Sequence, residues 1–193
     1  MISCNSNVTE TKIDSALLEE APINSKIETA YFLVKLKSSA DFFSVFHYAN
    51  SLEGVKESLA AKGDAEIILV VQKSSDEISL ADLEAKLIAA DGVSNVSCLQ
   101  VAEHYAQSDK TEKGKVSSLL IMLVDDAKLV DITKELLLNK SVNLCFAVNG
   151  KYNLIAELGF GSFAGTDKFI SNYVAAINGV LKVKELPIIN LYE

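Results

Sequence analysis

The sequence predicts an α+β fold made of two tandem ferredoxin-like βαββαβ repeats whose sheets pack against each other. Three observations carry this prediction. A hairpin pattern occurs twice, the two copies lie 87 residues apart, and the same order of strand and helix patterns surrounds each copy. The composition suits such a fold, because 193 residues with 49% apolar content can bury one large core or two small ones.

The clearer hairpin pattern runs through residues 142–158. Apolar residues alternate with small or polar ones from Val142 to Asn149, which is the two-residue period of a strand with one buried face. Asn149 and Gly150 then interrupt the alternation before a second apolar run. An Asn-Gly pair between two such runs favours a tight turn, because both residues tolerate the positive φ of a primed turn. The segment is therefore predicted to be a hairpin with its tip at Gly150.

The second copy of the pattern has its tip at Gly63. Residues 28–106 align with residues 115–193 without a gap, and Gly63 then matches Gly150 while Gly92 matches Gly179. The identities concentrate at turn glycines and at apolar strand positions, which a shared backbone geometry would preserve. We interpret the chain as a tandem duplication.

The remaining elements follow in order. The domain boundaries are an N-terminal arm over 1–27, a first repeat over 28–106, a charged linker over 107–114 and a second repeat over 115–193. In the first repeat the patterns predict a strand (29–37), a helix that Ser39 or Asp41 can cap (42–49), the hairpin (55–73), a helix (79–90) and a strand (93–105). In the second they predict a strand (116–124), a helix headed by Asp125 and Asp126, the hairpin, a helix (166–178) and a strand (180–192). Strand, helix, hairpin, helix, strand is the split βαβ order. Because two helices cover only one face of a four-stranded sheet, the two open faces are expected to pack together about a pseudo-twofold axis.

The composition argues against several classes. No apolar run approaches the roughly 20 residues of a membrane span, and the N-terminus has no signal-peptide pattern, so a cytoplasmic protein is expected. A net charge of −8, with 18 lysines and no arginine, argues against direct nucleic-acid binding. Cys4, Cys98 and Cys145 form no CxxC pair, so neither a disulfide framework nor a metal site is expected.

One stretch resembles a known family. The sequence G-K-Y-N-L-I-A-E-L at 150–158, followed by a predicted helix and by N-G-V-L-K-V-K-E-L-P-I-I-N-L at 178–191, resembles the ligand-binding domain of the Lrp/AsnC (feast/famine) transcription regulators. The resemblance covers 115–193, and 28–106 match it through the internal repeat. Asn153 stands where the family usually has Asp, the first repeat lacks the aromatic residue of the tip, and the family's helix-turn-helix domain is absent from the chain.

The resemblance implies an intrachain dimeric α/β barrel that binds a small-molecule effector, an amino acid or a small acid, without a cofactor. It implies partners as well: homo-oligomers of pseudo-dimers, or hetero-assemblies with related DNA-binding regulators. The main functional prediction is therefore a non-catalytic, effector-binding regulatory protein.

The family binds its effectors between neighbouring barrels, close to the hairpin tips. Carried over residue by residue, this places the ligand site at Gly150, Tyr152, Asn153, Gly63, Asp64 and Glu66. A turn glycine lets the backbone approach a small ligand closely, and an Asn side chain can both donate and accept hydrogen bonds. The alternative is that both glycines serve only the geometry of their turns.

A second function class stays open: a small enzyme of the wider dimeric α/β-barrel group, monooxygenase-like or isomerase-like, with its site inside the barrel. Such an enzyme needs polar groups that face inward, and the strands offer Glu66, Glu157, Asn143 and Asn153. We assign no catalytic residue. In the sequence, neither His47 nor His104 has a second histidine or a carboxylate at the spacing of a catalytic or metal site, so both are expected to be structural or solvated. The glycine-rich loop 159–165 lacks the spacing of a phosphate-binding motif.

Overall fold

The computed structural model describes residues 18–20, 27–74, 79–107, 116–189 and 191. In these residues the strands are β1 (Leu18–Glu20), β2 (Ile27–Leu36), β3 (Val55–Ala61), β4 (Ile67–Ser74), β5 (Val93–Gln107), β6 (Ser118–Val124), β7 (Val142–Asn149), β8 (Leu154–Leu158) and β9 (Val180–Ile189). The helices are α1 (Phe42–Asn50), α2 (Leu80–Ala89), α3 (Leu129–Leu137) and α4 (Phe163–Asn172), with the short 3-10 helices η2 (Asp126–Lys128) and η3 (Val174–Ala176). The order strand, helix, strand, strand, helix, strand runs from β2 to β5 and again from β6 to β9. Most of the predicted linker lies outside the described residues.

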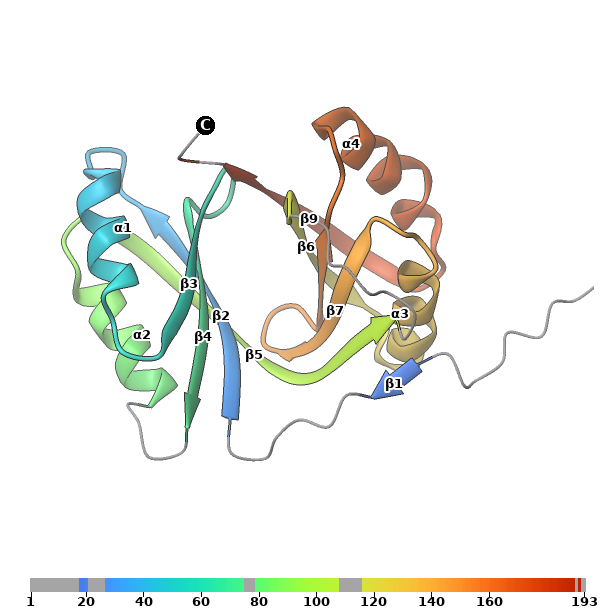
Figure 1. Cartoon of the computed structure of the whole chain (residues 1–193), viewed down its shortest axis with the longest axis horizontal. Helices are drawn as coiled ribbons and strands as arrows, with labels where there is room; N and C mark the ends of the chain where they lie inside the picture. The colour runs from blue at the N-terminus through green and yellow to red at the C-terminus, as the bar shows by residue number, and fades with distance from the viewer. Residues whose placement is uncertain (1–17, 21–26, 75–78, 108–115, 190, 192–193) are drawn as a thin grey trace, which may run out of the picture.

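Eight of the strands form a closed antiparallel barrel (Figure 1). The first half has the order β5-β2-β4-β3 and the second half has the order β9-β6-β8-β7. Pairing of β3 with β9 and of β5 with β7 joins the halves at both edges. β1, which belongs to the predicted N-terminal arm, pairs with the end of β5. The central strands are β2 and β4 in the first half and β6 and β8 in the second.

The helices cover the outside of the barrel, so the protein has two outer cores and one interior core (Figure 1). Phe32 and Leu87 belong to the outer core under α1 and α2, and Leu120 and Leu136 belong to the outer core under α3 and α4. The interior core takes buried side chains from both halves: Tyr31, Ala61, Ala65, Ile68, Leu99, Leu119, Ile121, Leu144, Phe146, Val148, Tyr152, Ile155 and Leu186. The two halves therefore share one core, as expected for a small barrel filled by its own side chains.

The two edges that close the barrel are unequal. β5 pairs with β7 over a long stretch, from Gln100 opposite Asn149 to Ala106 opposite Leu144, and we call this edge the long seam. β3 pairs with β9 only at Ala60–Ala61, opposite Ile188–Ile189, and we call this edge the short seam. Most of β3 therefore has no strand beside it on that edge among the described residues.

The two halves correspond with an offset that changes once along the chain. Tyr31 lies opposite Val70 of β4, and in the second half Leu119 lies opposite Glu157 of β8. The offset is 87 residues from Val70 to Glu157 but 88 residues from Tyr31 to Leu119. The prediction of a gapless alignment is thus wrong for the first strand, because the second half is one residue shorter between its first strand and its first helix.

Side-chain caps set the starts of three helices. Asp41, Ser79 and Ser162 each accept a hydrogen bond from a backbone N–H of the first helical turn, which satisfies a group that has no partner inside the helix. The sequence predicts the first two of these starts. It places the start of α4 at Thr166, whereas the structure begins this helix at Phe163, because Ser162 supplies an earlier cap.

A pH effect on stability follows from the packing of α4 against β9. Burial raises the pKa of the Glu185 carboxyl above its ordinary value of 4.5; the Ser118 hydroxyl opposes this shift in part, and the charge of Asp167 on α4 adds to it. Because the folded state binds the proton more tightly than the unfolded state, this contribution is fully present below about pH 4.5 and is lost as the pH rises through the raised pKa. We expect Glu185→Gln to raise Tm relative to the parent at pH 7 but not at pH 4. Equal shifts at both pH values would contradict this assignment.

In the part of the chain that the structure describes, no helix has the length and apolar character needed to cross a membrane.

Candidate functional site

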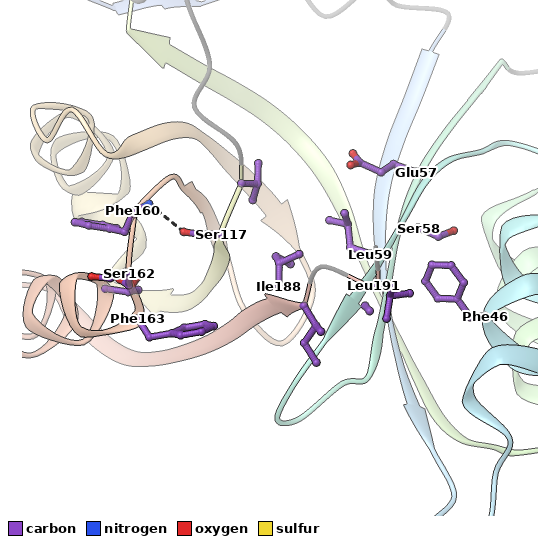
Figure 2. Close-up of a pocket in the computed structure, with 15 residues that line it drawn as sticks. Phe46, Glu57, Ser58, Leu59, Ser117, Phe160, Ser162, Phe163, Ile188 and Leu191 are labelled. Carbon is purple, nitrogen blue, oxygen red and sulfur yellow. Dashed lines mark hydrogen bonds between the residues drawn. The ribbon is translucent and has the colours of Figure 1, made fainter. Parts of the chain in front are cut away.

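A groove of about 830 Å³ opens between the two halves at the short seam. One wall is the start of α4 and the loop before it, and the other wall is β3 with Phe46 of α1 behind it (Figure 2). The ends of β6 and β9 lie between the walls. The lining residues are Phe46, Glu57, Ser58, Leu59, Ala60, Val116, Ser117, Phe160, Gly161, Ser162, Phe163, Thr166, Ile188, Ile189 and Leu191. The groove exists because β9 covers only the last two residues of β3.

Hydrogen bonds fix the α4 wall of the groove. The Ser117 hydroxyl accepts a hydrogen bond from the backbone N–H of Phe160 at 3.0 Å and donates one to the Leu158 carbonyl at 3.2 Å. Ser162 then starts α4 and turns Phe163 toward the opposite wall, where its side chain is 65% exposed (Figure 2). This wall therefore presents an aromatic ring and the positive end of a helix dipole to the groove.

The facing wall presents a carboxylate. Alternation along β3 puts Glu57 on the same face as Leu59 and Ala61, which pack with the interior core, and puts Ser58 on the opposite face. Figure 2 shows the Glu57 carboxylate directed into the space between the halves, while Ser58 points toward the helix side. Among the described residues that line the groove, Glu57 is the one ionisable side chain.

A second polar group crosses the barrel interior at the same level. Val70 of β4 lies opposite both Glu57 of β3 and Tyr31 of β2, so these two residues flank it on neighbouring strands. The Tyr31 hydroxyl donates a hydrogen bond of 2.9 Å to Glu157 of the other half. Burial, followed by the charge of Glu157 and its hydrogen bond, and then by the charge of Glu57, raises the pKa of Tyr31 far above its ordinary value. Tyr31 therefore stays protonated at physiological pH and acts as a donor.

The ring contacts of Tyr31 extend the link between the halves. Its ring lies 5.4 Å from that of Phe146, and the His104 ring lies 6.0 Å from the Phe146 ring on the other side. His104 thus packs on an aromatic side chain and is at a distance from the groove lining. Within the described ranges, no three side chains of His, Cys, Asp or Glu come together in a way that could hold a metal ion.

The predicted ligand residues of the second hairpin lie at the opposite end of the barrel strands from the groove. Gly150 has a φ of +149°, and a Cβ there would meet Leu99 at 3.1 Å. Tyr152 turns into the interior core and is 7% exposed. Asn153 accepts a hydrogen bond from Val124 N–H and donates to the Val124 carbonyl, both at 2.8 Å. The connection from Asn149 to Leu154 is thus longer than the predicted tight turn, because Tyr152 and Asn153 fasten it to the barrel.

The predicted residues of the first hairpin are also held by protein groups. Glu66 accepts hydrogen bonds from Lys35 at 2.6 Å and from the backbone N–H of Leu36 at 2.9 Å. Asp64, beside Gly63 at the tip, forms an ion pair with Lys184 of β9. The Lys184 ammonium also lies 6.0 Å from the centre of the Tyr152 ring, so β9 brings Asp64 and Tyr152 near each other. The ligand site at these six residues stays a prediction that the structure does not test.

Asn153 gives a direct test of a structural role at the tip. Asn153→Ala should lower the free energy of unfolding by about 1–3 kcal/mol, because it leaves both backbone groups of Val124 without their side-chain partner. The neighbouring Asn149→Ala, at an exposed position, is the control and should change stability by less than about 0.5 kcal/mol. Urea denaturation of both variants measures the difference. Equal stability of the two variants would show that the Val124 contacts contribute nothing.

One polar residue of this interior is predicted from the sequence, and two are not. Glu157 is predicted to face inward, and the structure confirms that its side chain meets Tyr31 across the barrel. Tyr31 and Glu57 are not among the predicted residues. Glu57 could have been found from its spacing, since it precedes the apolar positions Leu59 and Ala61 at the strand period of two.

Comparisons with known proteins identify the fold. No protein-family model and no curated protein matches the chain. The siroheme decarboxylase NirDL, solved alone and in co-complex with an iron-uroporphyrin III analogue, matches with a TM-score of 0.68 in both cases, over 85% of this chain and 72% of that chain, at 12% and 10% identity. A chlorite dismutase-like protein, TA0507, matches with a TM-score of 0.47 at 9% identity, over 86% of this chain and 95% of that chain. A monooxygenase-like protein of Fusobacterium nucleatum matches with a TM-score of 0.42 at 11% identity, over 84% of this chain and 90% of that chain.

The likeness establishes a ferredoxin-like dimeric α/β-barrel fold and contradicts the predicted function. The sequence predicts a non-catalytic, effector-binding regulator of the Lrp/AsnC type, whereas the similar structure with a TM-score of 0.68 is that of an enzyme, a siroheme decarboxylase. That prediction is wrong. The resemblance of the stretches 150–158 and 178–191 to a regulator concerns the fold, and a fold alone does not specify an activity.

Proposed function

We propose that the chain is a small α/β-barrel enzyme that moves a proton on an apolar carbonyl compound bound in the short-seam groove, with Glu57 as the general base. The observation that carries the proposal is the position of Glu57: a carboxylate on one wall of a mostly apolar groove whose other described lining residues carry no charge, opposite the start of α4. A carboxylate is a common general base, and an apolar surround is typical of sites for small organic ligands.

The two walls suit the two reacting parts of the substrate: the carbon that loses a proton and the carbonyl oxygen that gains negative charge. Glu57 takes a proton from the carbon next to the carbonyl, and the electron pair of the broken C–H bond shifts to form a C=C bond while the carbonyl oxygen gains negative charge. The positive end of the α4 dipole stabilises a charge that develops near it. Return of the proton from Glu57 to a different carbon of a conjugated enolate, or to the other face of the same carbon, restores the carbonyl. No electron is gained or lost overall, and the reaction is an isomerisation.

A ligand like the iron-uroporphyrin III analogue named with NirDL, an iron-bearing ring with several carboxylates, does not fit this groove. Recognition of several carboxylates calls for Arg or Lys, and an iron-bearing ring is commonly held by His, Cys or Tyr. None of these residue types is among the described residues of the lining. The proposed reaction therefore uses no such group, and the proposed substrate is a smaller carbonyl compound.

The reaction can be tested before the natural substrate is known. Abstraction of a proton next to a carbonyl in D₂O introduces deuterium, which NMR detects without knowledge of the product. We expect the protein to accelerate deuterium uptake into at least one member of a panel of aryl and alicyclic ketones. Glu57→Gln should lower this rate by about 10²–10⁴-fold, the usual contribution of a general base.

The control is Glu135→Gln, at an exposed position of α3 away from the groove, which should leave the rate unchanged. Both variants should keep the melting temperature of the parent. Uptake that Glu57→Gln does not slow would remove the proposed base, and no protein-dependent uptake across the panel would remove the proposed reaction.

A further inference from the structure

The charges around the short-seam groove select the ligand as well as the reaction. The described lining contains no Lys or His, the chain has no Arg, and the one ionisable side chain of the lining is the Glu57 carboxylate. Most of the remaining lining is aromatic or aliphatic, including Phe163 and Ile189, which are 65% and 44% exposed. An anionic group placed among these residues would lose its hydration without gaining a cationic partner.

Glu57 adds repulsion to this loss of hydration. A ligand carboxylate in the groove would bring a second negative charge close to the Glu57 carboxylate, which raises the free energy of the pair. The α4 dipole offers only partial compensation, since Ser162 already takes the N–H of Gly165 through its hydroxyl and that of Thr166 through its carbonyl. A neutral carbonyl needs no such compensation.

We infer that the groove binds uncharged apolar ligands and rejects carboxylates of the same shape, with Glu57 as the residue that determines this specificity. The inference rests on the proposed function for the position of the site and goes beyond it by naming the charge class of the ligand. It concerns equilibrium binding, so it can be tested independently of turnover.

Two probes of the same skeleton test the inference. 2-Acetonaphthone is neutral and 2-naphthoate is anionic, and isothermal titration calorimetry gives the dissociation constant of each. We expect the ketone to bind at least about tenfold more tightly than the carboxylate. Glu57→Lys should reverse this order, because it replaces the repelling charge with an attracting one.

Two further variants control for net charge and for location. Glu135→Lys changes the net charge by the same amount at an exposed position of α3, and it should leave the order of the two probes unchanged. Gly161→Phe should abolish binding of both probes without unfolding the protein. The position has space for a side chain, since a Cβ there meets nothing within 4 Å, and the added ring would occupy the groove.

Naphthoate binding as tightly as the ketone to the parent protein would overturn the inference, and so would the absence of binding by both probes. An order of affinities that Glu57→Lys and Glu135→Lys change equally would overturn the role of Glu57. If the ketone binds selectively but takes up no deuterium, the proposed reaction fails while the ligand class holds.

Discussion

Replacement of Ile155 by alanine is expected to lower the free energy of unfolding by about 2–5 kcal/mol, because the side chain is fully buried in the interior core. Ile155 lies on β8 opposite Ile121 and Phe146, so the cavity would form where neighbouring strands meet inside the barrel. The loss combines the transfer free energy of the deleted carbons with the cost of a cavity that the surrounding strands cannot collapse to fill.

The matched control is Ile88→Ala on α2, where the isoleucine is 56% exposed and little packing is lost. Alanine also has the higher helix propensity, so this change should stay within about 0.5 kcal/mol of the parent. Urea denaturation measures both free energies. If the two alanine variants are equally stable, the interior of the barrel is not a packed core, and a shared core does not hold the two halves together.

Gly92→Ala should also destabilise the protein, by about 2–4 kcal/mol. Gly92 has a φ of +88°, which L side chains adopt at a cost, and its new Cβ would lie 2.9 Å from the Cβ of Ala40 and 3.0 Å from Cγ2 of Val45. Neither contact is with the far end of a flexible side chain, so the backbone between α2 and β5 must move to relieve them.

Gly161→Ala provides the comparison for Gly92→Ala. A Cβ at Gly161 meets no atom within 4 Å, and its φ lies outside the left-handed region. This change should therefore leave Tm within about 2 °C of the parent, as surface substitutions usually do. Thermal unfolding of both alanine variants, followed by circular dichroism, tests the contrast. Similar loss in both would mean that alanine is unfavourable for a reason other than the close approach at Gly92.

The period of the apolar residues predicts the elements of this fold well, because each strand and helix buries a face. The same period predicts less well which residues of the two halves occupy equivalent positions. The gapless alignment pairs Leu33 with Leu120, yet Leu33 packs with the interior core and Leu120 with an outer core. Since successive strand residues point to opposite faces, one missing residue in a loop is enough to exchange them. Both positions hold leucine, so the alignment counts them as an identity although the two side chains pack in different cores. The tandem duplication itself stays a prediction.

The candidate site was harder to predict than the fold, because it depends on what the strands do not cover. Glu57 is one of many glutamates in the sequence, and it becomes distinctive only because β9 ends its pairing with β3 at Ala60. Tyr31 and Glu157 are 126 residues apart, and only closure of the barrel brings them to 2.9 Å. By contrast, Asn153 and Glu66 carry a recognisable local pattern, but their side chains are engaged by the ends of β6 and β2.

The unequal seams have a consequence for binding stoichiometry. In a barrel assembled from two identical chains, a symmetry axis would repeat any groove, and two ligands would bind with equal affinity. Here the edge of β7 that corresponds to the open edge of β3 is covered by β5 through Leu144, so the described residues leave no matching groove at the long seam. Titrations should therefore saturate at one ligand per chain, and the binding isotherm should be hyperbolic, without cooperativity between the halves.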